Sequence, residues 1–98
     1  MKVRFRTAKY ERLYRGTASG GGWDHGIVKS FRMRIQFLED IDDERSLRSM
    51  KAWRYEKLSG KRSHQRSIRL NDQWRLIIEL EQEDGEKVVV VHGIEDYH

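Results

Sequence analysis

The 98-residue chain contains no cysteine, which excludes disulfide bonds, cysteine-ligated zinc and thiol catalysis. Its length predicts one domain, residues 1–98, whose small core leaves any active site as an open groove on a sheet or at its edge. No apolar run approaches the roughly 18 residues of a membrane span, and no signal peptide is evident. We therefore expect a cytoplasmic protein with no membrane partner.

The N-terminal half predicts one strand and two helices. Residues 3–6 form a short apolar–basic alternation, and residues 10–14 have the spacing of a helical turn. The glycine-rich segment 16–26 predicts a loop, and it lacks the Gly-Lys-Ser/Thr of a phosphate-binding loop. From Asp24, a plausible N-cap, apolar residues recur every three or four positions and predict an amphipathic helix, with Ile27, Phe31, Ile35 and Leu38 on its apolar face. A second short helix is predicted over about 42–50.

The C-terminal half predicts four strands in succession, over residues 53–58, 66–70, 74–81 and 88–91. Asp84-Gly85 supplies the positive-φ positions of a tight hairpin turn. The β-branched run Val88–Val91 predicts a strand that is buried on both faces. Short connections make these strands an antiparallel meander. We predict an α+β fold in which an N-terminal strand and two helices pack on one face of an antiparallel sheet.

Charge is distributed unevenly along the chain. Residues 48–75 carry nine Lys/Arg against two Asp/Glu, a net of +7, whereas residues 76–98 carry one Lys against seven acids, a net of −6. A basic block of this size favours a polyanionic partner such as nucleic acid. The alternative is that these cations are solvated on the surface and pair with the acidic C-terminal segment.

The stretch RSIRLNDQWRLIIEL, residues 66–80, predicts a hairpin with one apolar face. We expect its other face to carry Arg66 or Arg69 together with Arg75. Cations on adjacent strands share one surface, and like charges opposite each other destabilise a sheet. An anion is therefore expected between them, either from a ligand or from Glu56.

The C-terminal EDYH is a second concentration of reactive groups. His98 can take and give a proton near neutral pH, Tyr97 can stack on a base, and Asp96 can orient either side chain. Beside the arginines, these groups would suit metal-independent RNA cleavage by a 2′-hydroxyl. The alternative is that terminal residues are frayed and inert. His92, His98 and Asp96 match no known metal-site spacing, so we predict neither a metal nor another cofactor.

The motif YEKLSGKRSHQRSIRLNDQWRLIIEL, residues 55–80, followed by the terminal EDYH, resembles the RelE/ParE superfamily of type II toxins. Within it, the chain is similar to the HigB-like plasmid-maintenance killer proteins of the GraT-like branch. The resemblance implies a RelE-like microbial RNase fold and cleavage of mRNA in the ribosomal A site. It also implies neutralisation by a cognate helix-turn-helix, HigA-like antitoxin.

The resemblance also assigns roles to residues. Asp96, Tyr97 and His98 match the terminal catalytic triplet of the family, and Arg75 matches the arginine that follows an aromatic residue. Lys57, Lys61 and Arg62 lie in the stretch that supplies basic residues to the groove. The full set of cations expected to bind RNA is Lys57, Lys61, Arg62, Arg66 and Arg69.

Glu56 departs from the ribosome-dependent members of the family, which carry a histidine at this position, although GraT-like members also have glutamate. A carboxylate can act as a catalytic base, but Glu56 can equally serve as an ion-pair partner for Arg66 or Arg75. A non-catalytic toxin is the alternative function, acting by binding DNA gyrase, as ParE-like relatives do, or ribosomal particles.

Overall fold

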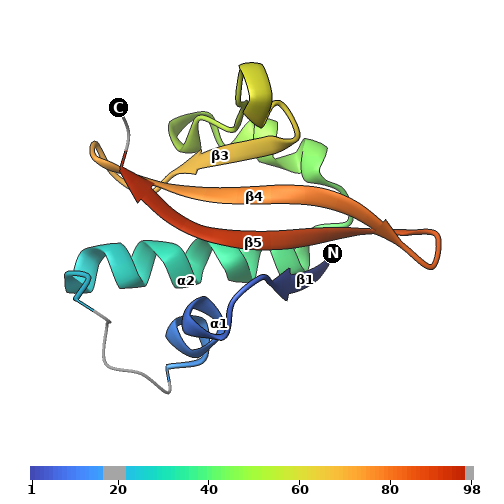
Figure 1. Cartoon of the computed structure of the whole chain (residues 1–98). Helices are drawn as coiled ribbons and strands as arrows, with labels where there is room; N and C mark the ends of the chain where they lie inside the picture. The colour runs from blue at the N-terminus through green and yellow to red at the C-terminus, as the bar shows by residue number, and fades with distance from the viewer. Residues whose placement is uncertain (17–21, 97–98) are drawn as a thin grey trace.

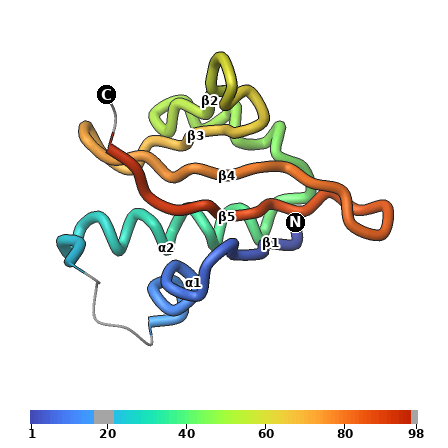
Figure 2. The backbone as a smooth tube through the Cα atoms, viewed as in Figure 1, coloured from blue at the N-terminus to red at the C-terminus, as the bar shows by residue number. Residues whose placement is uncertain are grey.

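The computed structural model describes residues 1–16 and 22–96. Within these residues, one sheet of five strands has the order β1-β5-β4-β3-β2 (Figure 2). The strands are β1 (Lys2–Phe5), β2 (Glu56–Lys57), β3 (Gln65–Arg69), β4 (Trp74–Glu83) and β5 (Glu86–Asp96). The helices are α1 (Ala8–Arg15), α2 (His25–Asp40) and the short 3₁₀ helices η1 (Glu44–Ser49), η2 (Lys51–Trp53) and η3 (Gly60–Arg62). Residues 17–21 of the predicted glycine-rich loop lie outside the described residues.

The predicted α+β architecture is confirmed, with α1 and α2 on the same side of the sheet (Figure 1). Strands β2 to β5 form the expected antiparallel meander. The sheet as a whole is mixed rather than antiparallel, because β1 pairs in parallel with β5, from Lys2 opposite Val88 to Phe5 opposite Val91. No helix in the described part of the chain is long and apolar enough to cross a membrane.

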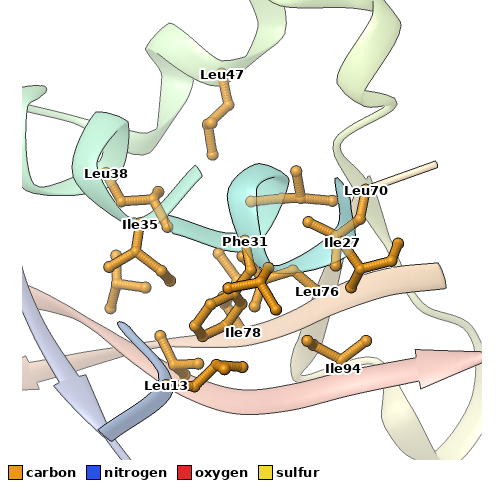
Figure 3. Packing of buried hydrophobic residues seen from close by; sticks show 14 residues of the cluster. Leu13, Ile27, Phe31, Ile35, Leu38, Leu47, Leu70, Leu76, Ile78 and Ile94 are labelled. Carbon is orange, nitrogen blue, oxygen red and sulfur yellow. The ribbon is translucent and has the colours of Figure 1, made fainter. Parts of the chain in front are cut away.

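Helix α2 supplies most of the helical side of the core. The carboxylate of Asp24 accepts a hydrogen bond from the Ile27 backbone N–H at 2.9 Å, which confirms the predicted N-cap. The apolar face of α2 packs against the inner face of β4 and β5, and Phe31 lies near Ile78 in this layer (Figure 3). The buried α2 residues of the core are Ile27, Val28, Phe31, Ile35 and Leu38.

The predicted strand over residues 53–58 is wrong in its first half. Only Glu56 and Lys57 pair with β3, while residues 51–53 form the 3₁₀ helix η2. Arg54 ends η2 in the left-handed region, at φ 46° and ψ 55°, and this conformation interrupts any extended run. The short helix expected over 42–50 is the 3₁₀ helix η1, whose N-cap is Asp43.

Strand β5 is covered on both faces, as the run of valines predicted. All four residues from Val88 to Val91 have no exposed surface. On the face away from the helices, Arg4 of β1 reaches across β5 and donates hydrogen bonds at 3.0 Å to Glu81 and to Glu83 of β4. Ion pairs between the two neighbouring strands therefore shield the outer valines from water.

A β-bulge bends the last part of β5. The register pairs Ile77 with Gly93 but Ile78 with Val91, which leaves His92 as the extra residue. Gly93 has φ 149°, and the Tyr10 ring of α1 packs directly on it. The bend sets the direction in which β5 continues towards Asp96.

Candidate active site

The face of the sheet that α1 and α2 leave uncovered carries several of the predicted site residues. Side chains alternate along a strand, so residues between the core positions of β3 and β4 point to this outer face. The strand register pairs Arg69 with Arg75 and Glu56 with Ser67. Arg69 is therefore the arginine that shares a face with Arg75, whereas Arg66 is on the opposite one.

Arg75 is a buried cation with a fixed orientation. It is 7% exposed, and its Nη1 donates a hydrogen bond to the hydroxyl of Ser67 at 3.1 Å. Ser67 is itself 1% exposed. The sequence analysis did not predict a role for Ser67. The signal that could have found it is a small polar residue at a strand position next to Arg66.

A hollow of about 140 Å³ opens beside Arg75 on the outer face. Strands β2 to β5 and the helix η3 all contribute to its wall. The lining residues are Glu56, Leu58, Arg62, Ser67, Arg75, Ile77, Glu95 and Asp96. Buried Arg75 and three acidic residues thus line a single concavity.

Arg62 forms one rim of this hollow. Its Nη2 donates to the Glu95 carboxylate at 2.8 Å, and its Nε donates to Gln65 Oε1 at 2.7 Å. These contacts tie η3 to the end of β5, although both partners of the ion pair remain nearly half exposed. An exposed pair of this kind is weak, so Arg62 can exchange Glu95 for another anion at little cost in free energy.

Glu56 also lines the hollow. The ion pair considered for it with Arg66 or Arg75 is absent from residues 1–16 and 22–96, and its side chain has no other hydrogen-bond or ion-pair partner there. Its carboxylate is therefore exposed beside a buried guanidinium and is accessible to a bound molecule.

The remaining predicted cations lie in different places. Lys57 pairs in register with Arg66, so both belong to the face opposite Arg75, and Arg66 donates to the Ser63 carbonyl at 3.1 Å. Lys61 is exposed on η3 and lines none of the hollows described. Arg69 lies on the outer face, where it donates to the Asn71 carbonyl at 3.2 Å and pairs with Asp72.

The charge expected to balance Arg69 therefore comes from its own hairpin turn. Sequence reasoning considered a ligand or Glu56 as the anion between the facing arginines. Asp72, three positions after Arg69 in the hairpin turn, is the anion that pairs with Arg69, and the sequence analysis did not predict it.

Asp96 is the last residue that the structure describes, and it pairs in register with Trp74. Its carboxylate accepts a hydrogen bond from Gln73 Nε2 at 3.2 Å, and the residue is among those that line the hollow beside Arg75. The other two members of the predicted triplet, Tyr97 and His98, lie outside the described residues.

A second polar cluster lies farther along the outer face and was not predicted. Glu79, 8% exposed, is hydrogen-bonded to His92 at the bulge, pairs with His64 at 3.0 Å and accepts from Arg6 at 3.2 Å. Burial raises the pKa of Glu79, but the hydrogen bond with His92 and the electrostatic influence of His92, His64 and Arg6 outweigh it, so that the pKa lies below its ordinary value.

The hollow around Arg75 combines two kinds of group that suit a phosphodiester. A buried, oriented guanidinium can stabilise negative charge that develops on phosphate oxygens, and carboxylates at the rim can accept a proton. In the described residues, no group of three His, Asp or Glu side chains has an arrangement suited to a metal ion.

Comparisons with known proteins agree with this architecture. The structure matches a YoeB/ParE toxin from Agrobacterium tumefaciens with a TM-score of 0.59 and 17% sequence identity, over 100% of both chains. At this identity the match shows the fold alone. No match was found among curated proteins.

A family model supplies the assignment that fold similarity leaves open. The model of the RelE-like toxin of the type II toxin–antitoxin system HigB matches residues 3–98, which is almost the whole chain. The chain therefore belongs to the HigB-like toxins of type II toxin–antitoxin systems.

Proposed function

We propose that this toxin is a ribosome-dependent endoribonuclease that inhibits translation by cutting mRNA. The observation that supports this most is the buried guanidinium of Arg75, held by Ser67 at the floor of a hollow rimmed by carboxylates. Such a cation is preorganised to stabilise a phosphorane, since its orientation is set before substrate binds. Family membership supports the same reaction.

In the proposed reaction, the ribose 2′-oxygen attacks the adjacent phosphorus and forms a new P–O bond. The bond from phosphorus to the 5′-oxygen of the next nucleotide breaks, which leaves a 2′,3′-cyclic phosphate and a 5′-hydroxyl. One group takes the proton of the 2′-hydroxyl and another protonates the departing 5′-oxygen. No water and no metal ion enter this step.

We assign the proton transfers to the C-terminal triplet and the rim carboxylate. His98 transfers a proton, Tyr97 stacks on a base or assists, and Asp96 orients them. Glu56 is available as the base, because it lines the hollow and has no partner among the described residues. Arg75 binds the scissile phosphate.

Arg69 lies on the same face of the sheet as Arg75, and Arg62 lies at the rim of the hollow beside Arg75. We propose that both arginines hold the mRNA backbone. Lys57, Lys61 and Arg66 are proposed to contact RNA outside the hollow. The natural partner is an antitoxin, since the family consists of toxins of two-component systems. We propose that this antitoxin is of the HigA-like, helix-turn-helix type.

A non-catalytic toxin that binds DNA gyrase or ribosomal particles is the second candidate. Glutamate rather than histidine at position 56 favours it, because a carboxylate does not stabilise phosphate charge.

Mapping of mRNA 5′ ends after brief induction separates the two. A nuclease produces new ends within codons, and His98→Ala removes most of them, because the loss of one positioned acid or base lowers a rate about 10²–10⁴-fold. DNA-damage signalling without new ends would identify a gyrase poison. Undiminished ends in His98→Ala would overturn the role of His98.

A further inference from the structure

We propose that a second hollow on the other side of Arg75 binds the phosphate of an RNA nucleotide next to the one that is cut. The inference rests on the proposed function and extends it by a subsite. This hollow has a volume of about 210 Å³. It is lined by Arg54, Arg69, Asn71, Asp72 and Arg75.

Arg54 is the residue that sequence reasoning gave no role. It is exposed, and its backbone lies in the left-handed region, where a residue with a Cβ is disfavoured. Among the described residues, Asp84 is the one other non-glycine residue with a positive φ, and its hairpin turn requires that conformation. Arg54 is the C-cap of η2, where its backbone N–H donates to the Lys51 carbonyl at 3.2 Å, and helices commonly end in this conformation.

The Arg54 side chain is also unpartnered. Within residues 1–16 and 22–96, its guanidinium has neither a hydrogen bond nor an ion pair, although it lines the hollow. This contrasts with Arg69 in the same hollow, which donates to Asn71 and pairs with Asp72. Arg54 thus presents an unneutralised cation to a concave surface.

The hollow has an excess of positive charge. Its lining includes three guanidinium groups and the single carboxylate of Asp72, whose side chain is 95% exposed. Arg69 and Arg75 face each other across the β3–β4 ladder, so two guanidinium groups lie on the same face of the hollow as the unpaired Arg54 side chain. Guanidinium groups match the geometry of phosphate oxygens, so an anionic phosphate suits this lining.

A nucleic-acid backbone fits the arrangement better than an acidic protein segment. Arg75 lines both hollows, so the two sites are contiguous through one side chain on one face of the sheet. A single strand presents regularly spaced phosphates to a basic groove of this kind. In the proposed complex, Arg75 holds the scissile phosphate while Arg54 and Arg69 hold its neighbour.

The decisive variant is Arg54→Gly. Glycine adopts the left-handed conformation without strain, so this change removes the guanidinium while the fold stays at least as stable, which thermal unfolding checks. Arg45→Gln is the charge-matched control, because Arg45 is exposed, pairs with Asp43 and lines neither of the two hollows beside Arg75. The probe is a single-stranded RNA with 2′-deoxy substitutions, which prevents cleavage during the measurement.

We expect Arg54→Gly to weaken binding of this probe by about tenfold at low salt. The slope of log affinity against log salt should fall in magnitude by about 0.7, the value for one contact to a single strand. Arg45→Gln should retain the wild-type slope. Equal affinities and slopes for wild type and Arg54→Gly would overturn the subsite.

A polyglutamate peptide of matched length tests the alternative occupant. If Arg54→Gly weakens binding of the peptide but leaves RNA binding unchanged, the hollow belongs to an acidic protein and the proposal is wrong. The binding test of the subsite can fail or succeed independently of the cleavage test of the nuclease assignment. If the wild-type protein cuts no mRNA but Arg54→Gly still weakens RNA binding, the nuclease assignment is wrong and the subsite stands.

Discussion

The Arg75 guanidinium donates to the Ser67 hydroxyl at 3.1 Å, between adjacent strands and almost out of contact with solvent. This contact fixes the cation against the sheet before any ligand arrives. A lysine at this position would keep the charge but lose the planar fork of donors that matches phosphate.

Arg75→Lys should therefore lower mRNA cleavage about 10²-fold, in the range seen when one preorganised donor is removed from a reaction centre. The measurement is the rate of cleavage in a purified ribosome complex. Arg15→Lys is the matched control, since Arg15 pairs with Glu11 on α1, and it should cleave at the wild-type rate. Full activity in Arg75→Lys would show that the fork geometry is unimportant.

Glu56→Gln tests the rim carboxylate. Glu56 is exposed and has no ion pair in the described part of the chain, so the change should alter the free energy of unfolding by less than about 0.5 kcal/mol. If Glu56 is the catalytic base, cleavage should fall at least 10²-fold. A variant with normal cleavage and normal stability would leave His98 as the base.

The cluster at Glu79 predicts a dependence of stability on pH. The folded-state pKa of Glu79 lies below its ordinary value of 4.5, so ionised Glu79 stabilises the fold above that pH. This contribution is lost as the pH falls through the lower, folded-state pKa. Urea unfolding of wild type between pH 3 and 7 should show the free energy of unfolding declining on the acidic side.

Glu79→Gln isolates this contribution. The variant should be less stable than wild type at pH 7, and the difference should shrink below pH 4.5 as the wild-type carboxylate is protonated. Glu11→Gln is the control, since its pair with Arg15 is exposed. A difference between wild type and Glu79→Gln that grows on acidification would contradict the assignment.

The elements that follow from local chemistry could be predicted from sequence. The apolar period of α2, its Asp24 cap and the Asp84-Gly85 turn depend only on neighbouring residues, and all three occur as expected. The parallel pairing of β1 with β5 could not be predicted in the same way. It joins strands at opposite ends of the chain, and no local pattern encodes that contact.

The same distinction applies to the site. Which of Arg66 and Arg69 accompanies Arg75 depends on strand register, and a shift of one residue reverses the answer. The left-handed conformation of Arg54 could not be predicted from sequence either, because no glycine or other local signal marks the end of η2 at this position. The motif pointed to the correct stretch of chain, but only the register shows which side chains share a surface.

The bulge at Gly93 should be intolerant of a side chain. A Cβ there would lie 2.6 Å from Tyr10 Cζ, and the backbone has φ 149°. Gly93→Ala should lower the free energy of unfolding by about 1–3 kcal/mol through overpacking, measured by urea denaturation. Because the bulge directs β5 towards Asp96, cleavage should fall as well.

Two variants separate crowding from backbone strain. Gly60 also has a positive φ, but a Cβ there meets no atom within 4 Å, so Gly60→Ala reports strain alone. In a Tyr10→Ala background, Gly93→Ala should destabilise less than it does in the wild type. Equal losses in both backgrounds would show that Tyr10 is not the obstacle.

The most direct test of the nuclease hypothesis uses a single 2′-deoxynucleotide. A ribosome complex is programmed with mRNA whose A-site codon is all ribose, or carries 2′-deoxyribose at the mapped cleavage position. We predict that the purified toxin cuts the first mRNA and leaves the second intact at that position, because the attacking hydroxyl is absent. Equal cleavage of both mRNAs would contradict 2′-hydroxyl attack at the Arg75 hollow.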